Sequence, residues 1–145
     1  MQKIIPPALV AICIFTMVAL HIFFPIAIIL DQPILAGIVG LGGLAFTISS
    51  ARLFSRIGTE IHKFHKPGQL VTSGLFRITR NPIYLGFLLL LLGVAIGLGS
   101  TAPFLMVGVF FVIANTWYIP FEERKMEETF GADYLAYKAR TRRWI

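Results

Sequence analysis

One stretch decides the fold: residues 81–121 read NPIYLGFLLLLLGVAIGLGSTAPFLMVGVFFVIANTWYIPF and contain no charged side chain. A helix needs about 20 apolar residues to cross the hydrocarbon core of a membrane, so this run of 41 residues is long enough to cross twice. Glycine and proline in residues 97–103, GLGSTAP, are typical of a turn. The stretch therefore predicts two membrane-spanning helices joined by a short connection.

Two further uncharged runs lie earlier in the chain. The run between Lys3 and Asp31 has 27 residues and the run between Asp31 and Arg52 has 20, so each is long enough for one crossing. Only 14% of the 145 residues are charged and 57% are hydrophobic, which is a membrane-protein composition. We therefore expect one all-α, integral membrane domain, residues 1–145, with four transmembrane helices at about 5–29, 33–53, 82–98 and 102–119.

The positive charges are distributed as this topology requires. With four crossings, all 13 Lys and Arg residues fall on the side of the two termini, and the other side keeps only Asp31. The positive-inside rule identifies the basic side as the cytoplasm. We expect an integral membrane protein with both termini in the cytoplasm, in the inner membrane of a prokaryote. Topology and contact with anionic lipid also explain the net charge of +6, so we expect no nucleic-acid partner.

Two cytoplasmic segments follow from the same assignment. The loop of residues 54–81 is long for so small a protein, and long loops are usually functional or disordered. The tail, residues 120–145, carries an aromatic and apolar stripe with helical spacing, which predicts an amphipathic helix that Gly131 can break into two pieces. The stripe consists of Glu122, Met126, Phe130, Tyr134 and Tyr137.

Other candidate features have simple structural interpretations. Cys13 is the only cysteine, so the chain has no disulfide or multi-cysteine metal site. His62 and His65 could share a helical face, but a proline and a glycine follow immediately, and we expect no metal site. The glycines of the second and third helices predict close helix packing, within the chain or in an oligomer. They are Gly37, Gly40, Gly43, Gly93 and Gly97.

Two motifs at the cytoplasmic rim could carry chemistry. Glu122 and Glu123 follow the fourth helix. As acids in the first turn of a helix, they would interact favourably with the helix dipole. Alternatively, the carboxylate pair would bind a cationic or polyhydroxyl ligand. Arg80-Asn-Pro-Ile-Tyr84 precedes the third helix, with Asn81 as N-cap and Pro82 at the first helical position. The same motif could instead offer backbone N–H groups to an anion beside an aromatic ring.

Together these motifs resemble the isoprenylcysteine carboxyl methyltransferase and phospholipid methyltransferase superfamily. The likeness covers about residues 58–145 and includes Arg80-Asn-Pro-Ile-Tyr-Leu-Gly86, the carboxylate pair and the tail Phe130-Gly-x-x-Tyr134-x-x-Tyr137. The resemblance implies a membrane methyltransferase that uses S-adenosyl-L-methionine and releases S-adenosyl-L-homocysteine without a soluble Rossmann domain. It implies cofactor binding by Gly68, Gln69, Leu70, Val71, Phe76, Asn81, Pro82, Ile83, Tyr84 and Glu122, with support from Arg80 and Glu123.

The resemblance is less informative about catalysis and the acceptor. Methyl transfer is an in-line displacement, which alignment of the reactants and exclusion of water can promote without a dedicated catalytic group. The catalytic residues are therefore unknown. Glu123, Tyr84 and His62 are candidates for a base that removes a proton from the acceptor. Where the eukaryotic prenylcysteine enzymes have an arginine that meets the substrate carboxylate, this chain has Tyr118, which we assign to the substrate. Their Arg-His-Pro histidine is Asn81 here. A lipid headgroup amine, a lipophilic thiol or a small hydrophobic acceptor remains open.

Three other functions are compatible with the sequence. A four-helix small-molecule exporter would have this size, but coupled cation export generally needs an ionisable residue at membrane depth, and no acid lies there. A non-catalytic membrane interaction protein would need no small ligand. A nicotinamide-dependent reductase is a minor alternative, because membrane sterol reductases resemble the broader fold.

Overall fold

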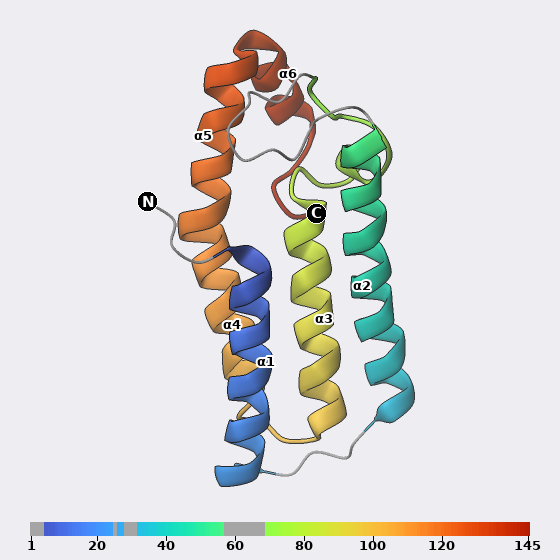
Figure 1. The fold of residues 1–145 in the computed structure, drawn as a ribbon, viewed down its shortest axis with the longest axis vertical. Coiled ribbons are helices and arrows are strands. Elements are labelled where there is room, and N and C mark those ends of the chain that lie inside the picture. The colour runs from blue at the N-terminus through green and yellow to red at the C-terminus, as the bar shows by residue number, and fades with distance from the viewer. Residues whose placement is uncertain (1–4, 25, 28–31, 57–68) are drawn as a thin grey trace.

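The computed structural model describes residues 5–24, 26–27, 32–56 and 69–145, and every regular element in these ranges is a helix (Figure 1). This confirms the all-α prediction. The elements are α1 (Pro6–Phe23), α2 (Pro33–Arg56), the 3₁₀ turn η1 (Gly74–Arg77), α3 (Pro82–Leu98), α4 (Phe104–Ile113), the π turn η2 (Ala114–Tyr118), α5 (Ile119–Phe130) and α6 (Ala132–Arg140).

Three helical segments are long and apolar enough to cross a membrane, namely Pro6–Phe23, Pro33–Arg56 and Phe104–Phe130. The chain is therefore an integral membrane protein. The apolar helix α3 has 17 residues, which is the lower end of the usual range for a spanning helix. The fourth crossing remains a prediction.

The predicted helix ends agree with the structure to different degrees. Helix α3 has the expected bounds, whereas α1 ends at Phe23 instead of residue 29, because the residue before Pro25 is disfavoured in helical geometry. Helix α2 continues three residues past the expected end, to Arg56. The part of the cytoplasmic loop at 57–68 lies outside the described residues.

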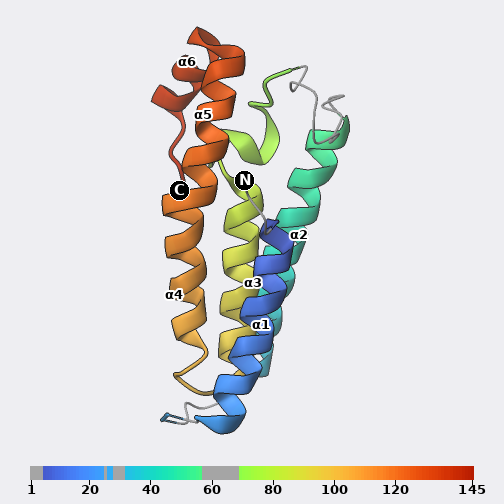
Figure 2. The same cartoon turned by 60° about the vertical axis from the view of Figure 1, so that its left-hand side comes forward.

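The expected boundary between a fourth transmembrane helix and a separate tail helix is wrong. Helices α4, η2 and α5 follow one another without a break, and Figure 2 shows α4 and α5 stacked end to end. Pro120 has no N–H, and its ring would clash with a carbonyl in the preceding turn of an ordinary helix. The wider π turn of residues 114–118 ends two positions before this proline, and the helix passes through position 120 instead of starting there.

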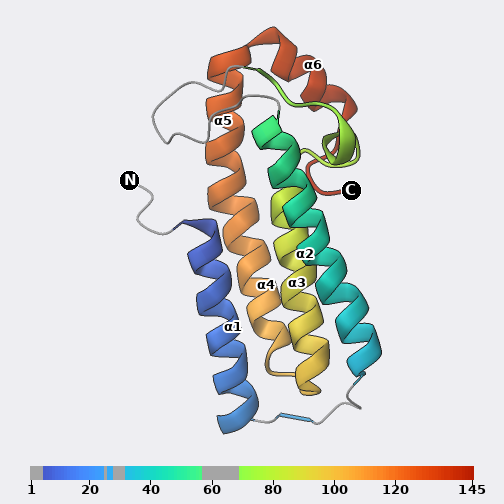
Figure 3. The same cartoon turned by 45° about the vertical axis from the view of Figure 1, so that its right-hand side comes forward.

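Glycines bring α2 and α3 into close contact along their length (Figure 3). A Cβ atom on Gly43 would lie 2.5 Å from the backbone N of Leu90, and one on Gly93 would lie 2.5 Å from the Cα of Gly40. The predicted packing role is confirmed for these glycines, but a Cβ on Gly37 would meet open space. The tightest glycines are thus used inside the chain and not on its outer surface.

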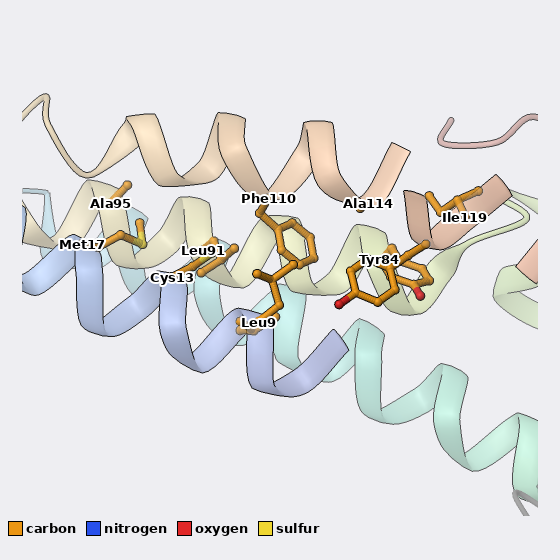
Figure 4. Close-up of a cluster of buried hydrophobic side chains, with 11 residues drawn as sticks. Leu9, Cys13, Met17, Tyr84, Leu91, Ala95, Phe110, Ala114 and Ile119 are labelled. Carbon is orange, nitrogen blue, oxygen red and sulfur yellow. The ribbon is translucent and has the colours of Figure 1, made fainter. Parts of the chain in front are cut away.

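An apolar core fills the space between α1, α3 and α4 (Figure 4). Cys13, Met17, Leu91 and Phe110 are all fully buried in it. Large apolar side chains such as Phe15 also cover the outside of the helices, as expected for surfaces that face lipid. The core fixes the three helices relative to one another, and the site lies beyond it at one end of the bundle.

Candidate functional site

A cavity of about 430 Å³ lies where the start of α3, the segment of residues 69–81, α5 and α6 meet. Its volume is typical of small-molecule sites. Described residues that line it are Pro6, Pro7, Ala51, Phe54, Gln69, Leu70, Val71, Phe76, Arg80, Asn81, Pro82, Ile83, Tyr84, Phe87, Glu122, Glu123, Lys125, Met126, Tyr134 and Tyr137.

The predicted cofactor residues come together at this cavity although they lie in distant parts of the sequence. All of them line it except Gly68, which lies outside the described residues. Those at 69–76 come from the segment before α3, those at 81–84 from its first turn, and Glu122 from α5. The tertiary structure therefore makes one site from two sequence motifs.

Tyr84 and Glu122 join the two motifs directly. The Tyr84 hydroxyl donates a hydrogen bond to Glu122 Oε1 at 2.6 Å. Tyr84 is buried, whereas Glu122 is exposed to the cavity and forms no ion pair within the described part of the chain. Lys125 lines the same cavity but does not lie within ion-pair distance of Glu122. A cavity-facing carboxylate that is hydrogen-bonded to a neutral hydroxyl and not ion-paired is suited to bind a cationic group of a ligand.

Glu123 has the opposite environment. It is only 5% exposed, with Arg80 Nη2 at 3.0 Å from Oε1 and Arg143 Nη2 at 2.8 Å from Oε2. Two guanidinium groups neutralise a buried carboxylate that would otherwise be costly. Because both oxygens already accept these bonds, the geometry favours a structural role for Glu123 over that of a base.

Asn81 occupies the N-cap position of α3, but its side chain does not cap the helix. Its Nδ2 instead donates to the carbonyl of Arg143 at 3.1 Å. Pro82 stands at the start of the helix as predicted. The capping interpretation of Asn81 is therefore wrong, because the C-terminal residues compete for its amide.

The C-terminal segment contacts residues of the site in a way that sequence reasoning missed. Residues 141–145, the C-terminal segment, fold back against the start of α3 and against η2. Arg80 N donates to Arg142 O at 2.9 Å, and Thr79 Oγ1 donates to Arg143 O at 2.9 Å. The sequence indicated only basic residues in a tail, and carbonyl acceptors leave no pattern in a sequence.

Helix α6 covers one side of the cavity. The Tyr137 hydroxyl donates to the carbonyl of Phe76 at 2.6 Å, and Tyr134 is buried beside it. Burial, and then the charge of Glu123, raises the pKa of Tyr134 to about 12, and burial also raises the pKa of Tyr137 to about 12. The predicted inward stripe and the break at Gly131 are both confirmed.

The remaining predicted residues lie further from the cavity or outside the described chain. The ring of Tyr118 lies behind that of Tyr84, with 6.2 Å between centroids, and does not line the cavity. His62 lies outside the described residues. Helices α1 and α2 also contribute Pro6, Pro7, Ala51 and Phe54 to the wall. Their ordinary apolar sequence gave no signal of this.

Comparisons with known proteins point to the same superfamily as the sequence motifs. The family model described as phospholipid methyltransferase matches residues 31–133, which is more than half of the chain. An "Uncharacterized protein" of Haemophilus influenzae is 38% identical over 63 residues, covering 43% of this chain and all of the relative. No solved structure matches the chain. The chain thus belongs to the phospholipid methyltransferase family, within the isoprenylcysteine carboxyl methyltransferase and phospholipid methyltransferase superfamily of membrane methyltransferases.

Proposed function

We propose that this protein transfers a methyl group from S-adenosyl-L-methionine to a lipophilic or membrane-associated small acceptor at the cytoplasmic face of the membrane. The observation that carries the proposal is the juxtaposition of Glu122 with the 69–84 segment around one cavity. Within the described residues this carboxylate is bonded to Tyr84 and to no cation. Such a site suits a ligand that brings its own positive charge.

The residues present fit the chemistry of the cofactor. Leu70, Val71 and Phe76 offer an apolar and aromatic wall for an adenine, while Glu122 and the ring of Tyr84 offer partners for ammonium and sulfonium groups. When bound, the cofactor supplies an electrophilic methyl group on a sulfonium centre. The chain's own part is to bind, to orient and to exclude water.

Two residues remain candidates for proton removal from the acceptor. The Tyr84 hydroxyl donates a hydrogen bond to Glu122, so the pair could accept a proton from the acceptor, with Glu122 as the final base. His62 is the other candidate, from the loop outside the described residues. An acceptor that reacts as a neutral amine needs no base for the displacement itself.

The cavity also bears on the class of acceptor. Tyr118 occupies the position at which the prenylcysteine enzymes have an arginine, and Arg80 is committed to Glu123. Lys125 also lines the cavity, and its ammonium lies 4.5 Å from the centroid of the Phe121 ring. We propose an acceptor without a free carboxylate, with Tyr84 forming the aromatic side of the acceptor site and Tyr118 supporting the Tyr84 ring from behind.

Binding of S-adenosylhomocysteine to purified protein tests the proposal. We expect saturable binding by titration calorimetry, and at least about tenfold weaker binding by Glu122→Gln, because the substitution removes the charge that meets the ligand's cation. Glu128→Gln is the matched control, since Glu128 is exposed on the same helix and lines no part of the cavity.

The results separate binding from folding. Folded wild-type protein that binds no S-adenosylhomocysteine would contradict the proposed function. Equal affinities of the Glu122→Gln and Glu128→Gln variants would show that the site has been misplaced. Membranes incubated with methyl-labelled cofactor, followed by identification of the labelled product, would then give the acceptor.

A further inference from the structure

We infer that Arg143, in the C-terminal segment, is a positioning residue for the cavity and sets the geometry of Glu122 and Tyr84 through Glu123 and the start of α3. The inference rests on the proposed function, because it concerns how that site is held. It assigns a role in ligand binding to the last residues of the chain, which make no part of the cavity wall themselves.

The first link runs from Arg143 to the acidic pair. Arg143 Nη2 lies 2.8 Å from Glu123 Oε2, and Arg80 holds the other oxygen of the same carboxylate. Glu123 is next to Glu122 on α5, so a shift of one changes the backbone that carries the other. Removing one guanidinium from a buried ion pair leaves a charge without full compensation, and the local structure must rearrange.

The second link runs from the backbone of Arg143 to the other motif. Its carbonyl accepts hydrogen bonds from Thr79 Oγ1 at 2.9 Å and from Asn81 Nδ2 at 3.1 Å. Thr79 is fully buried and Asn81 is 8% exposed, so water does not readily replace these bonds. Helix α3 begins at Pro82, the residue after Asn81, and Tyr84 lies in its first turn.

The third link fixes the C-terminal segment to the membrane-spanning helix. Asn115, in the π turn, accepts hydrogen bonds from Trp144 Nε1 at 3.1 Å and from Arg143 Nη1 at 3.4 Å. The Trp144 ring packs on Phe111, with 5.1 Å between centroids. Arg143 therefore joins three elements, η2, α5 and the start of α3, that carry or adjoin both halves of the site.

A neutral substitution of Arg143 tests the inference. We expect Arg143→Gln to weaken S-adenosylhomocysteine binding by at least about tenfold, because the carboxylate beside Glu122 loses a charged partner. The matched control is Arg140→Gln, which removes the same charge three residues earlier from an exposed side chain that forms no hydrogen bond or ion pair with the described residues. We expect its affinity to stay within about twofold of wild type.

A double-mutant cycle shows whether Arg143 acts through Glu123. If it does, Glu123→Gln and the double variant Glu123→Gln/Arg143→Gln will have similar affinities, because the pair is already broken by the first change. Additive losses from the two substitutions would contradict this route. A merely structural role would lower the melting temperature without changing the affinity of the protein that remains folded.

The outcomes separate the inference from the proposed function. Absence of binding by folded wild-type protein would overturn both. Binding by wild type with equal affinity in Arg143→Gln would overturn the inference alone. If Arg143→Gln does not fold, Arg143→Lys decides: we expect it to fold and to bind more weakly than wild type, and unchanged affinity would overturn the inference.

Discussion

Glu122 and Glu123 are adjacent and chemically identical, yet the fold gives them different partners. Glu123 turns toward two guanidinium groups, whereas Glu122 faces the cavity and the Tyr84 hydroxyl. Successive residues of a helix point about 100° apart, so a carboxylate pair on α5 necessarily meets two environments. One carboxylate ties the structure together, and the other is left for a ligand.

At the same scale, the Tyr137 hydroxyl holds α6 over the segment before α3. We expect Tyr137→Phe to lower the free energy of unfolding by about 1–2 kcal/mol, because the buried carbonyl of Phe76 loses its donor at 2.6 Å. Thermal unfolding of purified protein measures this change. Leu135→Ala, on the exposed side of α6, is the control, and an equal effect of the two substitutions would contradict the assignment.

The raised pKa of Tyr137 determines the pH range in which its hydroxyl can donate this hydrogen bond. With a folded-state pKa of about 12, above the ordinary value of a tyrosine, the hydroxyl keeps its proton and its donor role throughout the physiological range. Its contribution to stability is present below the ordinary pKa and is lost as the pH rises through about 12. We therefore expect no pH dependence from this contact near neutrality.

Among the elements, the α2 and α3 pair depends most on side-chain size. A Cβ on Gly43 would lie 2.5 Å from the backbone of α3, while a Cβ on Gly37 would meet nothing within 4 Å. We expect Gly43→Ala to destabilise the protein by about 1–3 kcal/mol through overpacking, and Gly37→Ala to have little effect. Melting temperatures of the two variants provide the measurement. Equal stability would mean that the helices are not in such close contact.

The π turn is the second element with a consequence for function. It lets one helix continue from the membrane-spanning part, past Pro120, to the residues that line the cavity. It also contains Asn115, which binds the C-terminal segment, and Tyr118, which packs behind Tyr84. π turns occur frequently at functional sites because they change which residues face a neighbour.

For the whole molecule, we predict that the chain crosses the membrane four times. If α3 spans, three crossings separate Gln32 from Ile145, and the two residues lie on opposite sides. We expect Ile145→Cys to react with an impermeant maleimide from the cytoplasmic side only, and Gln32→Cys from the other side only. The native Cys13 is buried and supplies the background control. Reaction of both from one side would mean that α3 does not cross.

The amino-acid sequence by itself determined that this is a membrane protein, where helix α3 begins and ends, and which residues of the tail form the inward-facing stripe. It also contained the two motifs that were expected at the cytoplasmic rim. These follow from local chemistry: long uncharged runs, a proline at a helix start and apolar residues at helical spacing. The resemblance then indicated one family, and the family match confirmed that the chain belongs to it.

Only the tertiary structure decided how the motifs meet. The distance between Tyr84 and Glu122, the pairing of Glu123 with Arg80 and Arg143, and the return of the C-terminal segment all depend on residues far apart in the chain. The continuous helix through Pro120 was also not predicted, because a proline after an apolar run is typical of a helix start and a π turn is rare. Spacing along a chain predicts a helical face, but packing decides which partner that face meets.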